Sequence, residues 1–478
     1  MTASSDASEK DVTVPVDVTA NATNNDAERD LRVWPSAHDE EIVEQTLNDP
    51  NGRPQETTEK PALSRILSRR SAASIDPGPP PDGGIVAWTQ VLCTHLTIFN
   101  TFGFFTSFGV YQTYYQNTLN IAPSTISWIG SMQVFLLFGI GTFTGRATDA
   151  GLFRPLYITG AVFQLVGIFT MAESTKLWQV FLSQGLCLGI ANGLQFCPSM
   201  ALVSTYFVRR RALSMGFTAL GSCTGGVIFP IIVQQCLPRL GFPWTIRIIG
   251  FIMLAANLFT IAFYRTRLPP RKAGPIVDWA SFRELPFTLY GIAMFFSFWG
   301  LYFAFFYIGS YGRNVLGTSY QQSINLLLVQ VCMGFIFRVL PSYYADKIGA
   351  MNVLIPFAFL CSIMMFAWIG IHSVAALYVF AVFYGSGSAV IQSLWPACIG
   401  KMNQTQDLKM SGVRMGMLFT VVSFSSFTGP PLAGALIENN GGDYTHANIW
   451  AGTSFFMGAC LLVATRWSLV GWDWKAKI

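Results

Sequence analysis

The chain has 478 residues, of which 52% are hydrophobic, 14% aromatic and only 12% charged. A soluble domain usually carries about 25% charged residues, so a chain that is soluble along its whole length is excluded. The net charge of +5 divides unevenly, because residues 1–81 hold 15 acidic and 8 basic side chains while residues 82–478 hold 10 and 22. The balance is therefore −7 in the first part and +12 in the second, and the chain consists of two chemically different parts.

Residues 1–83 form an acidic, polar tail in which apolar residues are isolated rather than periodic. Such a segment cannot bury enough apolar surface to offset the entropy of ordering, so we expect it to be disordered. A basic start followed by an apolar run, as in a signal peptide, is absent. The tail is therefore predicted to stay in the cytosol.

The rest of the chain is dominated by long stretches without Asp, Glu, Lys or Arg. Residues 83–145 are free of charge, which is enough for two membrane spans of about 20 residues each. Counting all such stretches predicts an all-α membrane protein with twelve transmembrane helices. The expected parts are a six-helix bundle over 84–264, a cytosolic central loop over 265–284, a second six-helix bundle over 285–470 and a cytosolic C-terminus over 471–478.

The loops between these helices carry their positive charge asymmetrically. When the loops are assigned alternately to the two sides, starting with the tail in the cytosol, 18 Lys and Arg residues fall inside and four fall outside. This asymmetry is typical of membrane proteins whose basic loops stay in the cytosol. It predicts that both termini are cytosolic, and it leaves Glu438 and Asp443 as solvated charges in the last outer loop.

The two predicted bundles repeat at one offset, 197 residues. The offset relates Phe99–Gly103 in the first helix to Phe296–Gly300 in the seventh, Asp149 to Asp346, and Gln195 to Gln392. Parallel repeats of this kind are typical of transporters in which two halves enclose a central cleft that opens alternately to either side. The spacing of Gly221 and Gly225 also predicts close approach between helices.

Several motifs resemble those of a known family. The loop from Gly145 to Arg154 is similar to the loop-two signature of the major facilitator superfamily, and a looser copy runs from Arg338 through Asp346 to Gly349. The opening segment from Pro81 to Trp88 resembles that of the monocarboxylate porter branch. Tyr206–Phe207 with Arg209–Ala212, then Gly225–Gly226 and Pro230, are similar to that branch as well, especially to its fungal members. The resemblance implies the major facilitator fold over about 83–470. It also implies a cytoplasmic latch formed by Gly145, Arg146, Asp149, Arg154, Arg338 and Asp346, with Asp149 bound at a helix terminus of the opposite half.

Charged side chains inside a bilayer are costly and usually functional, and the predicted spans hold few. The titratable side chain nearest the middle of a span is His95, which either carries a proton or bridges to a neighbouring helix. Proton-coupled monocarboxylate porters carry a lysine in helix one and an Asp/Arg pair in helix eight. Here the lysine and the aspartate are missing and Arg338 alone could stand in, so a lactate-like substrate is not favoured.

The remaining cleft candidates are amides, hydroxyls and one aromatic residue. Amides bind neutral polar groups in either direction, and aromatic rings stack on planar solutes. The candidates, with His95, are Asn100, Ser107, Gln195, Ser297, Trp299, Asn325, Gln330 and Gln392. They predict a transporter of a small organic metabolite that is neutral or weakly charged, such as a secondary metabolite or a vitamin-like compound. A proton-coupled monocarboxylate symporter and a solute sensor that does not transport are the alternatives.

Other classes of function lack a signal. The nine Cys fall in predicted spans without metal-binding spacing, and the four His are scattered, so neither a metal site nor paired catalytic groups are expected. We therefore predict no enzyme activity, no cofactor and no nucleic-acid partner. The expected partners are a small-molecule substrate, protons as a further candidate, and the lipid bilayer around a monomer. The plasma membrane is the predicted location, with the vacuolar membrane as the alternative.

Overall fold

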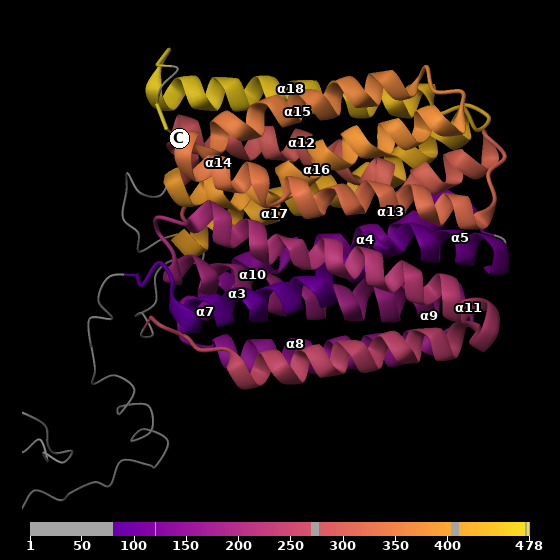
Figure 1. The fold of residues 1–478 in the computed structure, drawn as a ribbon, viewed down its shortest axis with the longest axis horizontal. Helices are drawn as coiled ribbons and strands as arrows, with labels where there is room; N and C mark the ends of the chain where they lie inside the picture. Colours follow the sequence, from indigo (N-terminus) through magenta and orange to yellow (C-terminus); the bar gives the residue numbers. More distant parts are fainter. Residues whose placement is uncertain (1–79, 120, 269–276, 403–410, 474–475, 478) are drawn as a thin grey trace, which may run out of the picture. The chain divides into compact units, whose positions relative to one another are not determined.

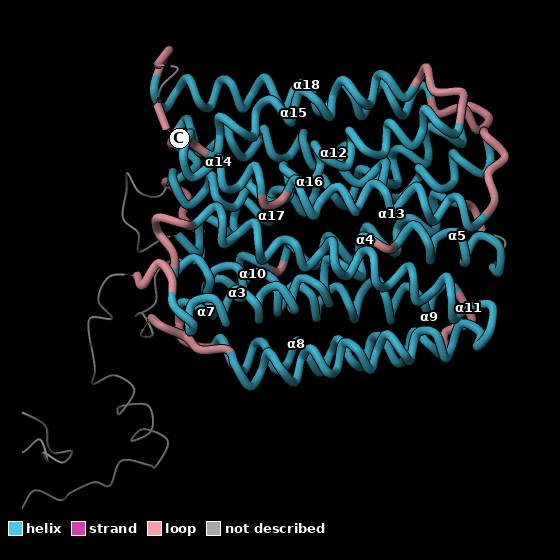
Figure 2. Tube along the Cα trace, in the orientation of Figure 1, coloured by secondary structure: helices cyan, strands magenta, loops and turns pink. Residues whose placement is uncertain are grey.

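The computed structural model describes residues 80–478 except for 120, 269–276, 403–410, 474–475 and 478. The predicted tail therefore lies, but for its last four residues, outside the described part. Every regular element within that part is helical, and none of it forms a strand (Figure 2).

The N-terminal half (Figure 1) contains five helices that are long and apolar enough to cross a membrane, and the last of them, α11 (Arg211–Phe263), is bent into two parts, which gives six crossings. Several of these crossings are built from more than one helical segment. Two segments, η1 and η2, are π-helical, a form that widens a helix locally and often marks functional positions. The elements of this half are α3 (Gly84–Ile98), η1 (Phe99–Gly103), α4 (Phe104–Thr106), α5 (Phe108–Leu119), α6 (Pro123–Gly139), α7 (Gly141–Asp149), α8 (Phe153–Ala172), α9 (Leu177–Val180), η2 (Phe181–Cys187), α10 (Leu188–Tyr206) and α11 (Arg211–Phe263).

The C-terminal half also contains six crossings, and a short 3₁₀ turn precedes it. Its elements are η3 (Ser281–Arg283), α12 (Leu285–Asn314), α13 (Tyr320–Phe337), α14 (Leu340–Ile348), α15 (Ala350–Trp368), α16 (Val374–Met402), α17 (Ser411–Asn439) and α18 (Thr445–Val470). We call the end of the bundle at which α3 begins and α18 ends the near end, and the opposite end the far end.

Eleven helices in the described part are long and apolar enough to cross a membrane. One of them, α11, runs over 53 residues and bends at Gly241, whose backbone is in a left-handed conformation with φ of 74°. Pro238 and Pro243 flank the bend, where the missing amide hydrogens weaken the helix. Because each part of α11 has at least the roughly 20 residues that one crossing needs, the eleven helices are enough for the twelve predicted crossings, although helices five and six join without the expected loop.

Small residues let the halves and their helices approach closely. A β-carbon at Gly221 would lie 2.1 Å from the backbone oxygen of His95, and one at Gly225 would lie 2.5 Å from that of Phe99. Both glycines therefore hold α11 against the first crossing, as their spacing predicts. Between the halves, α6 and α7 pack on α17, α5 packs on α12, and α11 packs on α13, α14 and α16.

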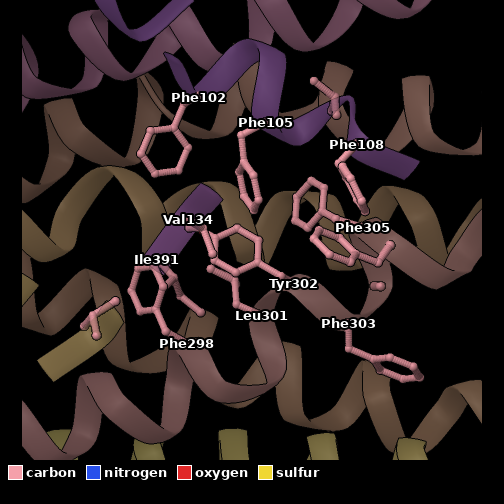
Figure 3. Close-up of a cluster of buried hydrophobic side chains, with 14 of the residues drawn as sticks. Phe102, Phe105, Phe108, Val134, Phe298, Leu301, Tyr302, Phe303, Phe305 and Ile391 are labelled. Atoms are coloured by element: carbon pink, nitrogen blue, oxygen red, sulfur yellow. The ribbon is translucent and has the colours of Figure 1, made fainter. Parts of the chain in front are cut away.

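Aromatic side chains fill the centre of the bundle (Figure 3). Phe105 of α4 meets Tyr302 of α12 edge to face at a centroid distance of 4.9 Å, and Phe108 of α5 meets Phe306 of α12 at 4.8 Å. All four side chains are buried. The contact between the two halves is therefore largely apolar around the site described next.

Candidate functional site

A small cavity, here called the polar cavity, lies between the halves at mid-height of the crossings. The N-terminal half lines it through α4 and α11, and the C-terminal half through α12, α13 and α16. Its polar lining side chains are Thr106, Ser222, Cys223, Gln330, Arg338, Ser388 and Gln392. Its volume of about 10 Å³ holds about one water molecule, so the halves are closed around the site.

A second cavity of about 20 Å³, the aromatic cavity, shares Arg338 and Gln392 with the first. Phe138 of α6 stands at its centre, with ring centroids 5.6 Å from Phe102, 5.9 Å from Phe298 and 5.8 Å from Trp395. Phe102 and Phe138 come from the N-terminal half, and Phe298 and Trp395 from the C-terminal half. Rings from both halves thus form a surface suited to a planar apolar group.

Arg338 connects the two cavities and is only 5% exposed. Its Nη1 donates a hydrogen bond to the backbone oxygen of Ala219 in α11 at 3.1 Å, and its Nη2 donates to Oε1 of Gln392 at 3.0 Å. Its Nε has no hydrogen-bond partner, and no carboxylate in the described part of the chain forms an ion pair with it. A buried cation without a counter-charge is costly, so this position favours a ligand that supplies an acceptor.

The sequence allows two roles for Arg338, an inner-loop charge at the end of helix eight and a stand-in for the helix-eight arginine of monocarboxylate porters, and the structure places it inside the crossing. The charge-free stretch ends at 337, but α14 continues α13 and the crossing runs from Tyr320 to Ile348. Arg338 therefore lies ten residues before the end of that crossing, or roughly 15 Å at 1.5 Å per residue. The apolar residues that follow Arg338 in α14 could have indicated that the helix continues beyond it, and the prediction did not use them.

Gln330 and Gln392 are the amide candidates that the structure brings together with Arg338. Gln330 is 1% exposed and neither of its amide atoms has a hydrogen-bond partner within the described structure. Gln392 accepts from Arg338, while its Nε2 is unpartnered. Two donors and one acceptor are thus available to a ligand at the polar cavity.

Gln195 lies elsewhere, inside the N-terminal half. Its Nε2 donates to Oδ1 of Asn257 at 3.1 Å, Asn257 donates to Oε1 of Gln164 at 2.8 Å, and Gln164 donates to Oδ1 of Asn192 at 3.2 Å. These four amides join α8, α10 and the second part of α11. Gln195 does not line either cavity.

The first-crossing candidates also lie outside both cavities. His95 bridges to α11, with Nδ1 3.1 Å from the backbone oxygen of Phe217 and Nε2 3.2 Å from the hydroxyl of Thr224. Asn100 donates to the backbone oxygen of Met253 at 3.1 Å. Ser107 donates to the backbone oxygen of Gly103 at 2.8 Å.

The remaining candidates of the C-terminal half do not reach the cavities either. Ser297 donates to the backbone oxygen of Ala293 and lies against Gly458 of α18. The indole nitrogen of Trp299 donates to the hydroxyl of Thr428 at 3.1 Å. Asn325 is half-buried on the far-end part of α13.

At the near end, a carboxylate of one half caps a helix of the other. The two oxygens of Asp346 accept hydrogen bonds from the backbone N–H groups of Ala212 and Leu213, each at 3.0 Å. These N–H groups belong to the first turn of α11, where positive partial charge favours a carboxylate. We call this contact the near-end latch.

Of the other residues assigned to the latch, Arg338 lies at the two central cavities and the remaining four lie around α7. Gly145 is buried within α7, Arg146 and Asp149 are half-buried, and Arg154 is exposed at the start of α8. α7 packs on α17, and the hydroxyls of Thr142 and Thr420 are 2.6 Å apart across this contact. Residues 403–410, which precede α17, lie outside the described part.

A similar contact lies at the far end, where Glu438 is exposed to solvent and also binds the other half. Oε1 of Glu438 accepts from the backbone N–H of Ser124 at 3.1 Å, and Oε2 accepts from its hydroxyl at 2.9 Å. Ser124 lies in the first turn of α6, in the other half. This contact is the far-end latch, and no pattern in the sequence predicts the pairing.

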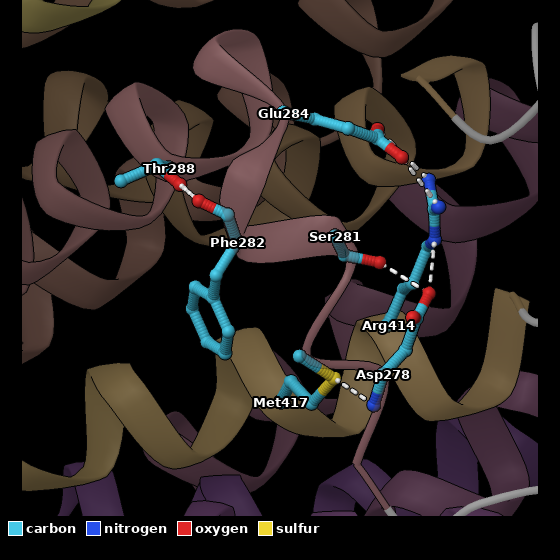
Figure 4. Close-up of polar contacts among 7 residues, drawn as sticks. All are labelled: Asp278, Ser281, Phe282, Glu284, Thr288, Arg414 and Met417. Carbon is cyan, nitrogen blue, oxygen red and sulfur yellow. Dashed lines mark hydrogen bonds and ion pairs between the residues drawn. The ribbon is translucent and has the colours of Figure 1, made fainter.

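A buried ion-pair cluster fixes the segment before α12 to α17 (Figure 4). Arg414 binds Glu284 in two places, at 2.8 and 3.3 Å, and its Nε lies 3.4 Å from Oδ2 of Asp278. The same oxygen of Asp278 accepts a hydrogen bond from the hydroxyl of Ser281. This hydrogen bond, with the neighbouring Arg414, holds the pKa of Asp278 below its usual value.

Twelve crossings in two halves, a closed central site shared by both halves and a latch at each end define a transporter of the major facilitator type. The model of the Major Facilitator Superfamily matches residues 94–408, and the chain belongs to this superfamily. The predicted fold class is confirmed.

The relatives found by comparison are fungal transporters. An MFS-type transporter of Gibberella zeae is 44% identical over 393 residues, covering 82% of this chain and 89% of that protein. The Aspyridones efflux protein apdF of Emericella nidulans is 35% identical over 391 residues, covering 81% of this chain and 79% of that protein. The crystal structure of the human organic anion transporter MFSD10 (TETRAN) superposes with a TM-score of 0.63 at 15% identity, covering 79% of this chain and 98% of that one. This last likeness concerns the fold alone.

Proposed function

We propose that this transporter exports a planar, weakly acidic organic metabolite by alternating access. The observation that carries the proposal is the buried guanidinium of Arg338, which has a free N–H and no carboxylate partner in the described part and faces both cavities. The acidic group of the substrate would accept from Arg338, because charge-assisted hydrogen bonds are the strong ones in a dry site. Its polar substituents would meet Gln330 and Gln392.

The aromatic cavity supports an extended apolar or aromatic part in the same substrate. Phe138, Phe298 and Trp395 provide ring faces and edges from both halves. A lactate-like acid would use the charge of Arg338 but would leave this surface empty. The proposal thus keeps a weakly charged metabolite and moves away from a neutral one, since the site contains the guanidinium of Arg338. A proton-coupled monocarboxylate symporter, suggested by the opening motif of the chain, is the alternative.

The proposed direction of transport and the proposed membrane are supported by other observations. Export is favoured by the name of the Emericella nidulans relative, an efflux protein. The excess of Lys and Arg in the near-end loops favours a cytosolic near end, and a plasma-membrane location follows for an exporter, with the vacuolar membrane as the alternative. The described linings of the two cavities include neither a carboxylate nor a histidine, so the proposal contains no proton step at this site.

The two latches supply the moving parts of the proposal. Release of Asp346 from α11 would open the near end for substrate loading, and release of Glu438 from α6 would open the far end. Each latch consists of hydrogen bonds between halves, so each is broken by a rigid rocking motion without unfolding a helix. Arg338 would hold the substrate at the pivot between them.

Flux into vesicles that contain the purified transporter tests the proposal. The probes are an aromatic carboxylic acid, a phenol, the neutral amide of the same acid, and lactate. We expect saturable flux of the acid and the phenol, little flux of the amide and lactate, and a loss of roughly 30-fold or more in Arg338→Gln. Arg239→Gln is the matched control, because Arg239 is exposed at the far end.

Two outcomes would overturn the proposal. One is normal flux of the acid in Arg338→Gln when the protein is present in the membrane at the wild-type level. The other is equal flux of the acid and its neutral amide in the wild type. Trp395→Ala should reduce flux of the aromatic acid, whereas Trp299→Ala, which alters a ring outside the aromatic cavity, should not.

A further inference from the structure

A groove of about 800 Å³ is lined by α8 and by the segment formed by α9 and η2, and it shares no lining residue with the central cavities. Val166 and Phe169 of α8 form one wall, and Trp178 and Leu182 form the other. The volume lies within the range of sites that bind whole organic molecules, about 300–1,000 Å³. The groove is therefore large enough to have an occupant of its own.

The groove opens to the lipid-facing surface of the bundle. Val166, Trp178 and Leu182 are 52%, 60% and 47% exposed, and their helices belong to membrane crossings of 20 and 30 residues. Exposed apolar side chains at this depth contact hydrocarbon rather than water. The material available to fill the groove is thus an acyl chain of the surrounding bilayer.

Charged groups of both signs lie where the groove reaches the far end of the bundle. Glu173, which lines the groove, caps α8, and its Oε1 binds Nη2 of Arg247 at 2.5 Å. Within the described structure its Oε2 receives no hydrogen bond, and its side chain is 63% exposed. Lys176 begins α9 three residues later and is also exposed.

This arrangement is complementary to a zwitterionic lipid headgroup. A primary ammonium has N–H groups to donate, and the second oxygen of Glu173 could accept one; a phosphate next to it would then be near Arg247, which binds Glu173, and Lys176. A choline headgroup has no N–H to donate. A headgroup with net negative charge would place a second anion near Glu173.

We propose that this groove binds one phosphatidylethanolamine molecule, with an acyl chain between α8 and η2 and the ammonium on Glu173. The apolar walls hold the chain and the charged end selects the headgroup. Because the groove is separate from the polar and aromatic cavities, the proposal of a lipid site does not depend on the identity of the transported substrate.

Native mass spectrometry of the full chain, released from nanodiscs of defined lipid composition, tests the site. With equal amounts of phosphatidylethanolamine, phosphatidylcholine and phosphatidylglycerol, we expect the wild type to retain one phosphatidylethanolamine at least fivefold more often than either other lipid. Glu173→Gln should lose this selectivity. Leu182→Trp, which fills the groove, should lose retention of all three.

Val162→Trp is the matched control, because Val162 is 54% exposed on the same helix but does not line the groove. It should retain the lipid as the wild type does. Equal retention of the three lipids by the wild type would overturn the proposal, as would unchanged selectivity in Glu173→Gln. If Leu182→Trp fails to fold, the Glu173→Gln result alone decides, since that side chain is exposed and its change affects one surface ion pair.

Discussion

Glu438 and Ser124 join the two halves of the transporter through two hydrogen bonds, one to the backbone N–H and one to the hydroxyl of the serine. At the opposite end of the bundle Asp346 also joins the two halves, but it accepts both of its hydrogen bonds from backbone N–H groups in the first turn of α11, those of Ala212 and Leu213. In both cases a carboxylate of the C-terminal half caps a helix N-terminus of the N-terminal half. The closed state is thus held at both ends by one type of interaction.

Glu438→Gln should favour opening of the far end. The amide keeps one acceptor but loses the charge that the helix N-terminus stabilises, a difference of about 0.3–1 kcal/mol, or roughly two- to fivefold in population. Distances between spin labels at Thr118 and His446, which belong to different halves, should shift toward longer values. Asp443→Asn is the control, because Asp443 binds only Thr445 of its own half. A longer distance in both variants would argue against a specific role of Glu438.

Asp346→Asn should loosen the near end. The amide keeps one acceptor but loses the charge that the N-terminus of α11 stabilises, a difference of about 0.3–1 kcal/mol, so we expect roughly a two- to fivefold increase in labelling of near-end positions and slower flux at a normal level of protein in the membrane. Lys347→Gln changes the neighbouring charge without altering the hydrogen bonds to α11 and should leave both properties unchanged. Wild-type labelling and flux in Asp346→Asn would remove the latch from the mechanism.

Asp149→Asn is expected to impair flux in the same way without preventing membrane insertion. Asp149 is the repeat partner of Asp346 at the end of α7, and Arg154→Gln serves as the comparison on the exposed start of α8. Insertion is measured by the amount of folded protein recovered from membranes. Normal flux in Asp149→Asn would leave Asp346 as the sole carboxylate of the near-end latch.

The crossings could be predicted from the sequence because hydrocarbon thickness fixes their length and charge interrupts them. The face that each helix turns toward the centre could not be predicted from the sequence, since helices buried among others are apolar all round. Gln195 and Gln392 illustrate this difference: they are repeat partners, yet Gln392 lines both cavities while Gln195 binds Asn257. Likewise, Trp395 and Trp299 are the same residue type in apolar helices, and the sequence does not indicate that Trp395 lines the aromatic cavity while Trp299 does not.

The burial and the pairing of charged residues also could not be predicted from the sequence. A single Arg after an apolar run fits both the end of a helix and the start of a loop, and the continuation of the crossing into α14 shows that Arg338 is buried. Long-range pairs such as Glu438 with Ser124 connect residues 314 positions apart, and no local pattern encodes them. The burial of Arg338 and the far-end latch therefore became visible only in the three-dimensional structure.

Gly221→Ala should destabilise the N-terminal half. Its added methyl group would meet the backbone oxygen of His95, which cannot move independently of its helix, and overpacking of this kind costs about 1–3 kcal/mol. We expect a melting temperature a few degrees lower in detergent. At Gly370 an added methyl group meets only an ordinary contact at 3.7 Å, so Gly370→Ala should melt like the wild type. Equal melting of the two variants would contradict the close approach of α11 to α3.

Asp278 gives the cluster with Arg414 a defined pH dependence. The hydroxyl of Ser281, and next the charge of Arg414, hold the pKa of Asp278 below its ordinary value near 4. A lowered pKa in the folded state means that the carboxylate contributes stability above the ordinary pKa and loses it as the pH falls through the lowered pKa. Asp278→Asn should therefore melt below the wild type at pH 7, and the difference should narrow as the pH falls below about 4. Ser281→Ala, which retains the ion pair, should show a smaller difference at pH 7, and a gap for Asp278→Asn that stays constant from pH 7 to pH 3 would refute the assignment.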